Sequence, residues 1–154
     1  MKALADTNFV VALLDRKDSL HKRAIALNER LVEKAAELFY ADCVINETVS
    51  VLVRRLREQR RTDDIDGLLD AIEESFPRDS LTWTYPSLDE EWSEVFGLVR
   101  KTHGRVNFHD ALLSLAASSL GIPCIVSFDT NLDSLAGWKR ISRPEDLSSL
   151  GKSS

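Results

Sequence analysis

The chain has 154 residues, of which 44% are hydrophobic and 29% are charged, and its net charge is −5. This composition is typical of a single globular domain with a substantial core, and no apolar run is long enough to cross a bilayer. Because an acid follows so soon after the N-terminus, the start of the chain does not have the pattern of a signal peptide. We therefore expect a cytoplasmic protein whose two cysteines, Cys43 and Cys124, are reduced and partly buried.

The first part of the sequence is predicted to alternate between strands and helices. A short buried strand is expected at the N-terminus, and Asp6, Thr7 or Asn8 is suited to cap the helix that follows. Apolar residues then recur at steps of three and four, which predicts an amphipathic helix. The expected elements are a strand at Ala3–Ala5, a helix ending at Leu14, a helix over Leu20–Leu38 and a strand at Phe39–Ala41.

The middle of the chain is predicted to form a projecting helical hairpin followed by a strand. One helix begins near Val44 and carries an apolar stripe, and a second helix restarts at Thr62. Pro77 ends this region. The segment Leu81–Tyr85 alternates and contains residues that favour β-structure, which predicts a strand.

The last part of the chain is predicted to contain two helices and two strands. Ser87–Glu90 has the pattern of a capping box, and the helix that it opens has an expected core stripe of Leu88, Trp92, Val95, Phe96 and Val99. The remaining elements are an apolar helix from about Asn107 to Gly121 and strands at Ile122–Phe128 and Trp138–Ile141. We expect one domain over residues 1–147 and a flexible tail over residues 148–154.

Strands that alternate with helices predict an α/β fold with a mainly parallel sheet covered on both faces. In such a sheet, ligands bind beyond the carboxyl ends of the strands. Asp6 and Asp129 directly follow predicted strands, and Glu47 and Asp110 lie in the expected first turns of helices. We therefore expect these four acids to converge at one edge of the sheet.

Four converging carboxylates cannot all stay ionised in a cleft without a counter-charge. Oxygen ligands favour Mg²⁺ or Mn²⁺, and this combination points to metal-assisted cleavage of a phosphodiester. Each acid also has a simpler explanation when it is taken alone. Asp6 or Asp129 could cap a helix or end a strand, and Glu47 could be an acid favoured by the helix dipole.

Four segments resemble the acidic motifs of PIN-domain ribonucleases, and especially of VapC toxins from type II toxin–antitoxin pairs. They are Leu4–Asn8, Ala41–Glu47, Phe108–Ala111 and Ser127–Leu132. The resemblance covers most of the chain and implies a three-layer α/β/α sandwich. The last motif departs from the pattern, because the family often has Asp and Phe where this chain has Asn131 and Leu132. Asp133 could substitute for the missing acid or could be a turn residue.

The resemblance also implies roles for the site residues. Asp6 and Asp110 would hold the principal Mg²⁺ or Mn²⁺, Asp129 would contribute directly or through water, and Glu47 would ligate a metal or orient the attacking water. Thr7 or Asn8 could bond to a metal-bound water or a phosphate oxygen. His109 is interpreted as a surface or packing residue, although acid–base work is an alternative.

The implied partners are an RNA substrate, a small VapB-like antitoxin whose C-terminal segment would lie across the acidic cleft, and a second copy of the chain in a homodimer. A basic cluster on the third predicted helix has two interpretations. Its side chains could favour the helix dipole, or they could guide RNA or an acidic partner. The cluster comprises Arg54, Arg55, Arg57, Arg60 and Arg61, of which Arg54, Arg57, Arg60 and Arg61 are the candidate contacts to RNA or to a partner. Trp83, Trp92 and Trp138 are expected to serve core or interface packing rather than base stacking.

Two other functions remain open at this point. A haloacid-dehalogenase-like phosphatase also begins with a strand and an Asp, but that family needs a second acid at the position of Asn8. A PIN-like module could instead bind RNA or protein without cleaving it, although the complete set of acids argues against this.

Overall fold

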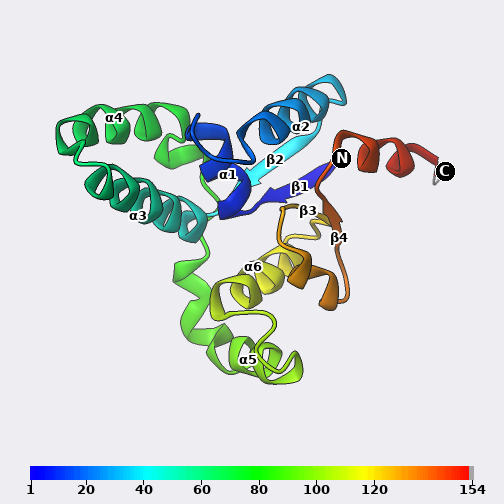
Figure 1. Cartoon of the computed structure of the whole chain (residues 1–154). Coiled ribbons are helices and arrows are strands. Elements are labelled where there is room, and N and C mark those ends of the chain that lie inside the picture. Colours follow the sequence, from blue (N-terminus) through cyan, green and yellow to red (C-terminus); the bar gives the residue numbers. More distant parts are fainter. Residues whose placement is uncertain (153–154) are drawn as a thin grey trace.

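A computed structural model describes residues 1–152, which form a four-stranded sheet with helices on both faces (Figure 1). The strand order is β2–β1–β3–β4, and every neighbouring pair is parallel. The strands are β1 (Lys2–Ala5), β2 (Glu37–Tyr40), β3 (Cys124–Val126) and β4 (Lys139–Ile141). The predicted α/β fold with a parallel sheet is therefore confirmed.

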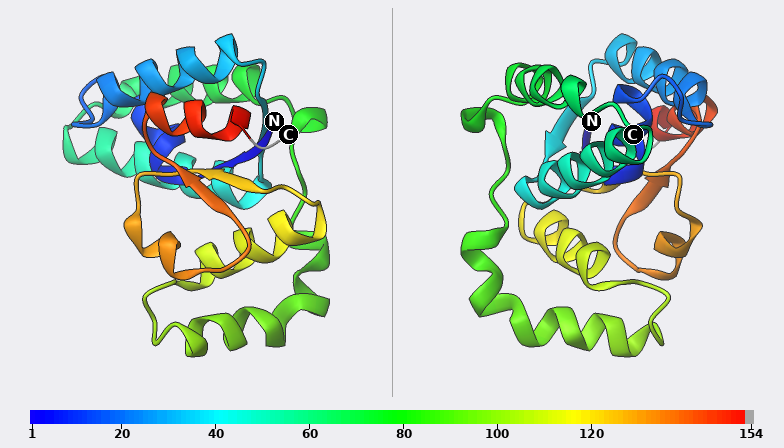
Figure 2. Two further views of the ribbon diagram at one scale, coloured as in Figure 1. Left: turned by 90° about the vertical axis from the view of Figure 1, so that its right-hand side faces the viewer. Right: turned by 60° about the vertical axis from the view of Figure 1, so that its left-hand side comes forward.

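Helices cover the sheet in two layers. Helices α1 and α2 and the 3₁₀ segment η5 lie on one face, and α6, with α5 outside it, lies on the other (Figure 2). The α-helices are α1 (Thr7–Leu14), α2 (His21–Glu33), α3 (Asp42–Glu58), α4 (Ile65–Ser75), α5 (Leu88–Lys101) and α6 (Phe108–Ser119). The 3₁₀ segments are η1 (Thr62–Asp64), η2 (Arg78–Ser80), η3 (Tyr85–Ser87), η4 (Thr130–Ser134) and η5 (Pro144–Lys152).

The centre of the sheet is an apolar core that determines where a site can form. Ala3, Leu4, Ala5, Ile125 and Val126 are fully buried, because helices cover both faces of β1 and β3. The chain leaves β1 toward β2 on one side and later returns to β3 on the other. This reversal makes the carboxyl ends of β1 and β3 the topological switch point, where open α/β sheets bind ligands.

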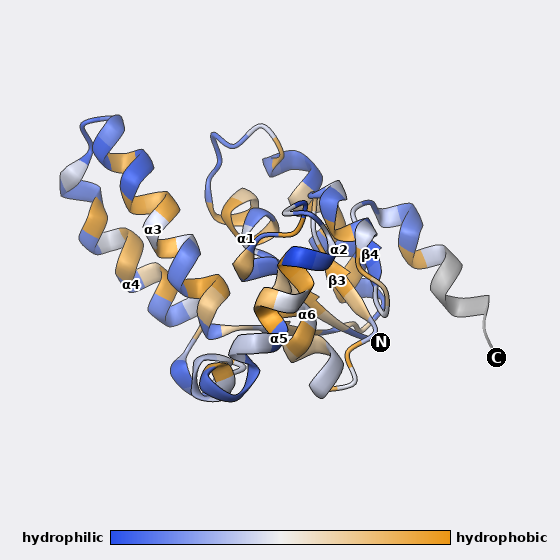
Figure 3. Ribbon diagram, turned by 90° about the horizontal axis from the view of Figure 1, so that it is seen from below, coloured by the Kyte–Doolittle hydropathy of each residue, from blue (hydrophilic) through white to orange (hydrophobic). Residues whose placement is uncertain are grey.

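Helices α3 and α4 lie side by side and project from the body of the molecule (Figure 1). Their hydrophobic segments face each other, which is visible as orange ribbon between the two helices in Figure 3. Val11 of α1, Leu52 of α3 and Ile72 of α4 form a small buried cluster at the base of the hairpin. The predicted helical hairpin is therefore confirmed.

The long helix predicted over Leu20–Leu38 is wrong at its C-terminal end. Helix α2 ends at Glu33, and Ala35 adopts a left-handed φ of 48° that reverses the chain. The amides of Ala35 and Ala36 bond back to Val32 and Leu31, which terminates the helix. Leu38 continues the spacing of the apolar residues of α2, but it lies in β2.

The strand predicted at Leu81–Tyr85 is also wrong. Only Thr82 forms an isolated bridge, to Ala41 at the end of β2, and the chain then turns into η3. The buried carboxylate of Asp42 explains this turn, because it accepts hydrogen bonds from the amides of Thr84 and Tyr85 and from the Thr84 hydroxyl. Sequence periodicity cannot detect such a long-range anchor.

Helix α5 differs from its prediction in two ways. Ser87 precedes the helix, but its hydroxyl donates to the Thr84 carbonyl and caps no helix amide. Of the predicted core stripe, Val95 is fully buried, whereas Trp92 and Phe96 are exposed. The helix therefore presents an aromatic surface outward that the sequence assigned to the core.

The other termini and strands agree broadly with expectation. Gly121, at a φ of 63°, follows the end of α6, and β3 and β4 lie within their predicted ranges. Cys43 and Cys124 are buried and form no disulfide. Within residues 1–152, no helix is long and apolar enough to span a membrane. The segment η5 runs to Lys152, residues 153–154 lie outside the described part, and flexibility of the tail over residues 148–154 stays a prediction.

A candidate acidic site at the carboxyl edge of the sheet

Asp6 lies at the switch point and is held by a dense set of donors. Its amide bonds to the Val126 carbonyl, which fixes it between β1 and β3, and its carboxylate caps α1 by accepting from the Thr7 amide at 2.7 Å. The other carboxylate oxygen accepts from the Asn8 amide group at 2.7 Å and from the Ser127 hydroxyl at 2.6 Å. Only 3% of the residue is exposed. The carboxylate is therefore ordered before any ligand arrives.

Ser127 links the first and last acidic segments, and the sequence analysis did not include it among the site residues. Its buried hydroxyl donates to Asp6 and accepts from the Asp129 amide at 3.0 Å. Asn8 completes the link by accepting from the Phe128 amide at 2.9 Å. The available signal was a small hydroxyl residue directly after a buried strand and two positions before Asp129.

Asp110 lies in the first turn of α6, as predicted, and only 6% of it is exposed. Asn107 caps this helix by accepting from the Asp110 amide at 2.9 Å, so the cap sets the start of the helix. Burial raises the pKa of Asp110 to about 7, and the charges of Asp6, Asp129 and Glu47 act in the same direction. Burial likewise raises the pKa of Asp6, against the hydrogen bond from Ser127. Burial is the main cause of both shifts, and repulsion between neighbouring acids adds to it.

Glu47 lies in the second turn of α3 and not in the first, because the helix begins at Asp42. Its carboxylate accepts from the Thr7 hydroxyl at 2.7 Å. His109 brings its Nε2 to 3.3 Å from both the Glu47 carboxylate and the Thr7 hydroxyl. His109 therefore lies beside Glu47 and Thr7, so its packing role and the acid–base alternative both stay predictions.

The four predicted acids line one cavity of about 460 Å³, which we call the acidic cavity. Thr7, Asn8 and Asn107 also line it, and Arg54 and Arg55 contribute cationic groups from α3. The acids come from four separate places in the chain: Asp6 follows β1, Asp129 caps η4 after β3, Glu47 lies in the second turn of α3, and Asp110 lies in the first turn of α6. The structure thus brings the four acids to one edge of the sheet, around a single cavity.

The donor set of the acidic cavity suits a hard divalent cation. All four acids offer oxygen ligands, and the pKa values of Asp6 and Asp110 are raised mainly by burial and further by neighbouring acids, whose charge a cation would offset. Within residues 1–152, no three His, Cys, Asp or Glu side chains approach closely enough to form a ready-made metal site. The oxygen donors by themselves are of the type that Mg²⁺ or Mn²⁺ prefers, and Mg²⁺ commonly keeps several waters between itself and a protein.

Other predicted residues lie farther from the acids. Asp129 caps η4 by accepting from the Asn131 amide at 2.8 Å, so Asn131 supports the site through its backbone. Asp133 faces away and forms a two-point ion pair with Arg140, at 2.8 and 2.9 Å, which lowers the pKa of Asp133. Neither Asn131 nor Asp133 lines the acidic cavity.

The predicted arginine cluster divides between several surroundings. Arg54 lines the acidic cavity and lies 4.0 Å from Glu58, and Arg61 pairs with Asp64 at 2.7 Å. Arg57 and Arg60 are exposed near the end of α3 and line neither this cavity nor the next. The cluster therefore does not form one continuous basic surface on the rim of the acids.

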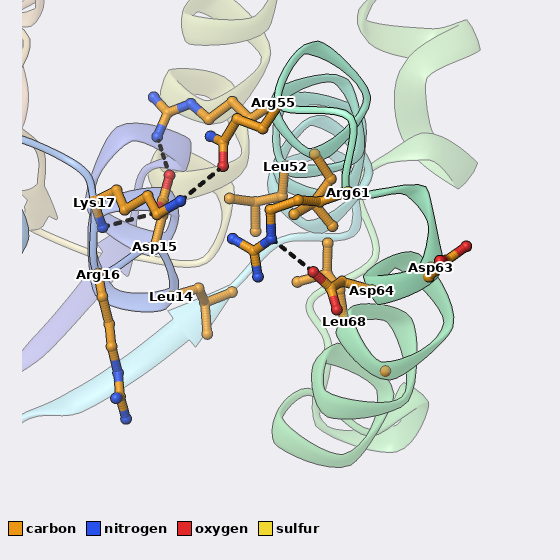
Figure 4. A pocket seen from close by; sticks show the side chains of 13 residues that line it. Leu14, Asp15, Arg16, Lys17, Leu52, Arg55, Arg61, Asp63, Asp64 and Leu68 are labelled. Atoms are coloured by element: carbon orange, nitrogen blue, oxygen red, sulfur yellow. Dashed lines mark hydrogen bonds and ion pairs between the residues drawn. The ribbon is translucent and has the colours of Figure 1, made fainter.

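A second cavity of about 590 Å³ lies on the other side of Arg55, between the α3–α4 hairpin and the loop after α1 (Figure 4). We call it the hairpin cavity. Leu14, Leu52 and Leu68 form part of its wall, and its charges are largely paired. Arg55 donates to Asp15 and Asp18 at 2.8 Å, while Lys17 donates to Gln59 at 3.1 Å.

Comparison with known proteins places this geometry in context. A model of the PIN domain matches residues 3–137, and no curated protein matches the sequence significantly. The sarcin–ricin-loop-cleaving toxin VapC20 of Mycobacterium tuberculosis has a similar structure, with a TM-score of 0.64 and 22% identity over 90% of this chain and 98% of that one. VapBC2 of Rickettsia felis, solved with a DNA fragment from its promoter, gives a TM-score of 0.60 and 12% identity over 92% of this chain and 98% of that one.

Proposed function

Because the chain belongs to the PIN domain family, we propose that it is a Mg²⁺- or Mn²⁺-dependent endoribonuclease and the toxin of a VapBC-type pair. The observation that carries the proposal is the acidic cavity, where Asp6, Glu47, Asp110 and Asp129 meet at the switch point of the sheet. Family membership also removes support from the phosphatase alternative. In this chain the Asn8 side chain is engaged with Asp6 and Phe128 and does not provide a second acid.

Asp6 and Asp110 would hold the ion, with Asp129 and Glu47 contributing directly or through water. When bound, the ion supplies a more acidic water, a polarised phosphoryl oxygen and a stabilised leaving group. The chain's own residues preorganise this arrangement. Asn8 and Ser127 orient Asp6, and the Thr7 hydroxyl holds the Glu47 carboxylate, which would ligate the ion or orient a water.

The two solved relatives support the RNA substrate and the antitoxin partner. One is a toxin that cleaves the sarcin–ricin loop, and the other is a VapBC assembly. Charge gives a physical reason for a protein partner. The acids that line this cavity outnumber its arginines by five to two, which favours a basic segment, and a cationic antitoxin residue placed there would take the position of the metal and block cleavage.

The direct test is to incubate the purified chain with total cellular RNA and Mg²⁺ or Mn²⁺. We expect discrete cuts that disappear with EDTA and in Asp6→Asn. Asp79→Asn is the matched control, because this exposed acid in η2 lies outside the acidic cavity and should leave the cuts unchanged. If folded wild-type protein binds Mn²⁺ and cuts no RNA from the organism's own transcripts, the non-catalytic binding module replaces this proposal.

A further inference from the structure

A third cavity, of about 360 Å³, lies between the α5–α6 loop, α6 and the end of η4, and we call it the basic cavity. Lys101, His103 and Arg105 line it together with Ser114 of α6 and Ser134 of η4. No Asp or Glu is among the described residues that line it, although the 25 acids of the chain outnumber its 20 Lys and Arg residues. A local excess of positive charge in an acidic chain favours an anionic ligand at this place.

The backbone of the α5–α6 loop holds these cationic residues in a defined arrangement. His103 and Gly104 both adopt a left-handed φ, of 52° and 75°, and the Gly104 amide bonds back to the Val99 carbonyl. The hydroxyl of Thr102 accepts from the amide of Val106, a fully buried residue, at 3.4 Å. The loop is therefore held by its own hydrogen bonds and by a side chain in the core.

The cations of the basic cavity have no carboxylate partner. Arg61 and Arg140 each form an ion pair with an Asp, whereas the exposed Lys101 and Arg105 form none in the described part of the chain. The dipole of α5 favours Lys101 in its last turn, but Arg105 lies beyond the end of the helix, where this explanation does not apply. The two side chains are therefore available to an anionic ligand.

The basic cavity and the acidic cavity lie along the same two elements. On α6, Asp110 lines the acidic cavity and Ser114 lines the basic cavity, one turn or about 6 Å farther along the helix axis. After β3, Asp129 caps the start of η4 and lines the acidic cavity, and Ser134 at the end of η4 lines the basic cavity. Figure 2 shows η4 beside the α5–α6 loop at this end of the molecule. An extended ligand bound at the acids can therefore reach the cations.

We propose that the basic cavity binds backbone phosphates of single-stranded RNA on one side of the scissile bond, with Lys101 and Arg105 as the main contacts. The position of the scissile bond rests on the proposed ribonuclease function. The guanidinium of Arg105 can donate two parallel hydrogen bonds to one phosphate, and Lys101 adds a point charge. The Ser114 hydroxyl can donate to a further phosphate oxygen. Such contacts would hold an anionic substrate beside acids that repel it when no metal is bound.

A neighbouring cavity favours RNA over an acidic protein as the ligand. It has a volume of about 210 Å³, shares Leu98, Ser114 and Ala136 with the basic cavity, and is also lined by Trp138. The indole of this half-buried residue donates to the Leu132 carbonyl at 3.4 Å, which orients the ring. Cationic groups beside an aromatic side chain are the combination that binds single-stranded nucleic acid, because a base can stack next to its phosphate.

Fluorescence anisotropy with a labelled single-stranded RNA of about 16 nucleotides measures the binding, and EDTA prevents metal-dependent cleavage. The double variant Lys101→Gln/Arg105→Gln should bind this RNA at least about tenfold more weakly than wild type. Its slope of log affinity against log salt should become shallower by about 0.7 for each lost phosphate contact. Lys22→Gln/Lys34→Gln is the matched control, because it removes the same charge from exposed positions at the two ends of α2 and should leave both quantities nearly unchanged.

Added negative charge provides an independent variant. Ser114→Glu places a carboxylate inside the basic cavity and should weaken RNA binding as the double variant does. Ser119→Glu places the same charge at the exposed end of the same helix, where it lines neither the basic cavity nor its neighbour, and should bind RNA like wild type. Thermal unfolding of both variants checks that the fold persists.

Cleavage of the identified RNA locates the contact relative to the cut. The Lys101→Gln/Arg105→Gln variant should raise KM and leave the single-turnover rate at saturating RNA nearly unchanged, because its contacts lie away from the reacting phosphate. Shortening the RNA on one side of the cut should remove the difference between wild type and this variant. Shortening it on the other side should preserve the difference.

The outcomes separate this proposal from the ribonuclease proposal. A wild-type chain that binds no RNA, or a double variant with unchanged affinity and salt slope, overturns the RNA site even where wild type cleaves RNA. A double variant that keeps RNA and loses an acidic protein partner overturns it as well, since the basic cavity would then be a protein site. If wild type binds RNA through Lys101 and Arg105 but cuts none, the RNA site stands and the ribonuclease proposal fails.

Discussion

The acidic cavity and the hairpin cavity share Arg55 as a wall, yet they treat carboxylates in opposite ways. In the hairpin cavity, partial burial acts to raise the pKa of Asp15, but the Arg55 guanidinium lowers it below its usual range. In the acidic cavity, burial and neighbouring acids raise the pKa of Asp110 to about 7. Arg55 offsets the charge of Asp15 in the hairpin cavity and of Asp18 at the edge of the acidic cavity, whereas the acids around Asp110 repel one another. This contrast identifies the smaller cavity as the better candidate for chemistry.

The largest effect on RNA cleavage should come from neutralising a buried acid of the acidic cavity. We expect Asp110→Asn to lower RNA cleavage by more than about 10³-fold, at the upper end of what a single transition-state contact contributes. Single-turnover cleavage of the identified RNA would measure it, with Asp66→Asn as an exposed helical control. Retention of full activity in Asp110→Asn would contradict the role given to this residue.

A smaller loss is expected when the support of an acid is removed and the acid is kept. Ser127→Ala deletes the 2.6 Å hydrogen bond to Asp6 and the acceptor of the Asp129 amide. Groups that orient metal ligands typically contribute 10- to 100-fold to activity or metal affinity, so a loss of about that size is expected. Titration with Mn²⁺ would separate weaker metal binding from slower cleavage. Ser127→Thr keeps the hydroxyl and should recover part of the activity.

The raised pKa of Asp110 should also affect the stability of the metal-free protein. The folded pKa of Asp110, about 7, lies above the ordinary Asp value of 3.8. Its contribution to stability is therefore complete below pH 4 and is lost as the pH rises toward 7. Asp110→Asn removes this loss and should raise the free energy of unfolding at pH 8 by about 2 kcal/mol, allowing for relaxation of the cavity. Urea unfolding with EDTA at pH 5 and pH 8 would show a gain mainly at the higher pH.

Added Mn²⁺ should make wild type more stable to urea than Asp110→Asn at pH 8. Binding to the folded wild type stabilises it by mass action, whereas the variant lacks one ligand. The urea midpoint of wild type is measured at Mn²⁺ concentrations that support cleavage. If Mn²⁺ does not change this midpoint, the effect of Asp110 on stability is separate from its proposed role in holding the ion.

The sequence predicted the sheet and the four acids because both depend on local patterns. A buried strand followed by an acid, or a helix that starts with one, can be recognised within a few residues, as at Asp6 and Asp110. The resemblance to the family then supplied the order of the motifs. What local patterns could not show was the partner of each polar group. Ser127 and His109 acquire their place in the site only through contacts with Asp6 and Glu47 across the fold.

The errors have the same origin. The strand expected at Leu81–Tyr85 is replaced by a turn because Asp42, about forty residues earlier, accepts its amides. Trp92 was placed in the core because its spacing matches that of Val95 and Val99, although the helix turns this residue outward. Periodicity gives the width of an apolar stripe and cannot say whether its edge is covered by the same chain or by another.

The smallest effect is expected in the hairpin cavity, where the charges are already paired. Arg55→Met removes the ion pairs to Asp15 and Asp18 and should destabilise the fold by about 1–2 kcal/mol, because these groups are only partly shielded from water. The lowered pKa of Asp15 fixes the pH dependence. Its contribution is present above about pH 4, the unfolded value, and disappears as the pH falls through the folded value, so wild type and Arg55→Met should converge in acid. Thermal unfolding from pH 3 to pH 8 would follow this convergence. A difference that instead stayed the same down to pH 3 would mean that Arg55 stabilises the loop by packing and not by charge, and the contrast between the two cavities would lose its electrostatic basis.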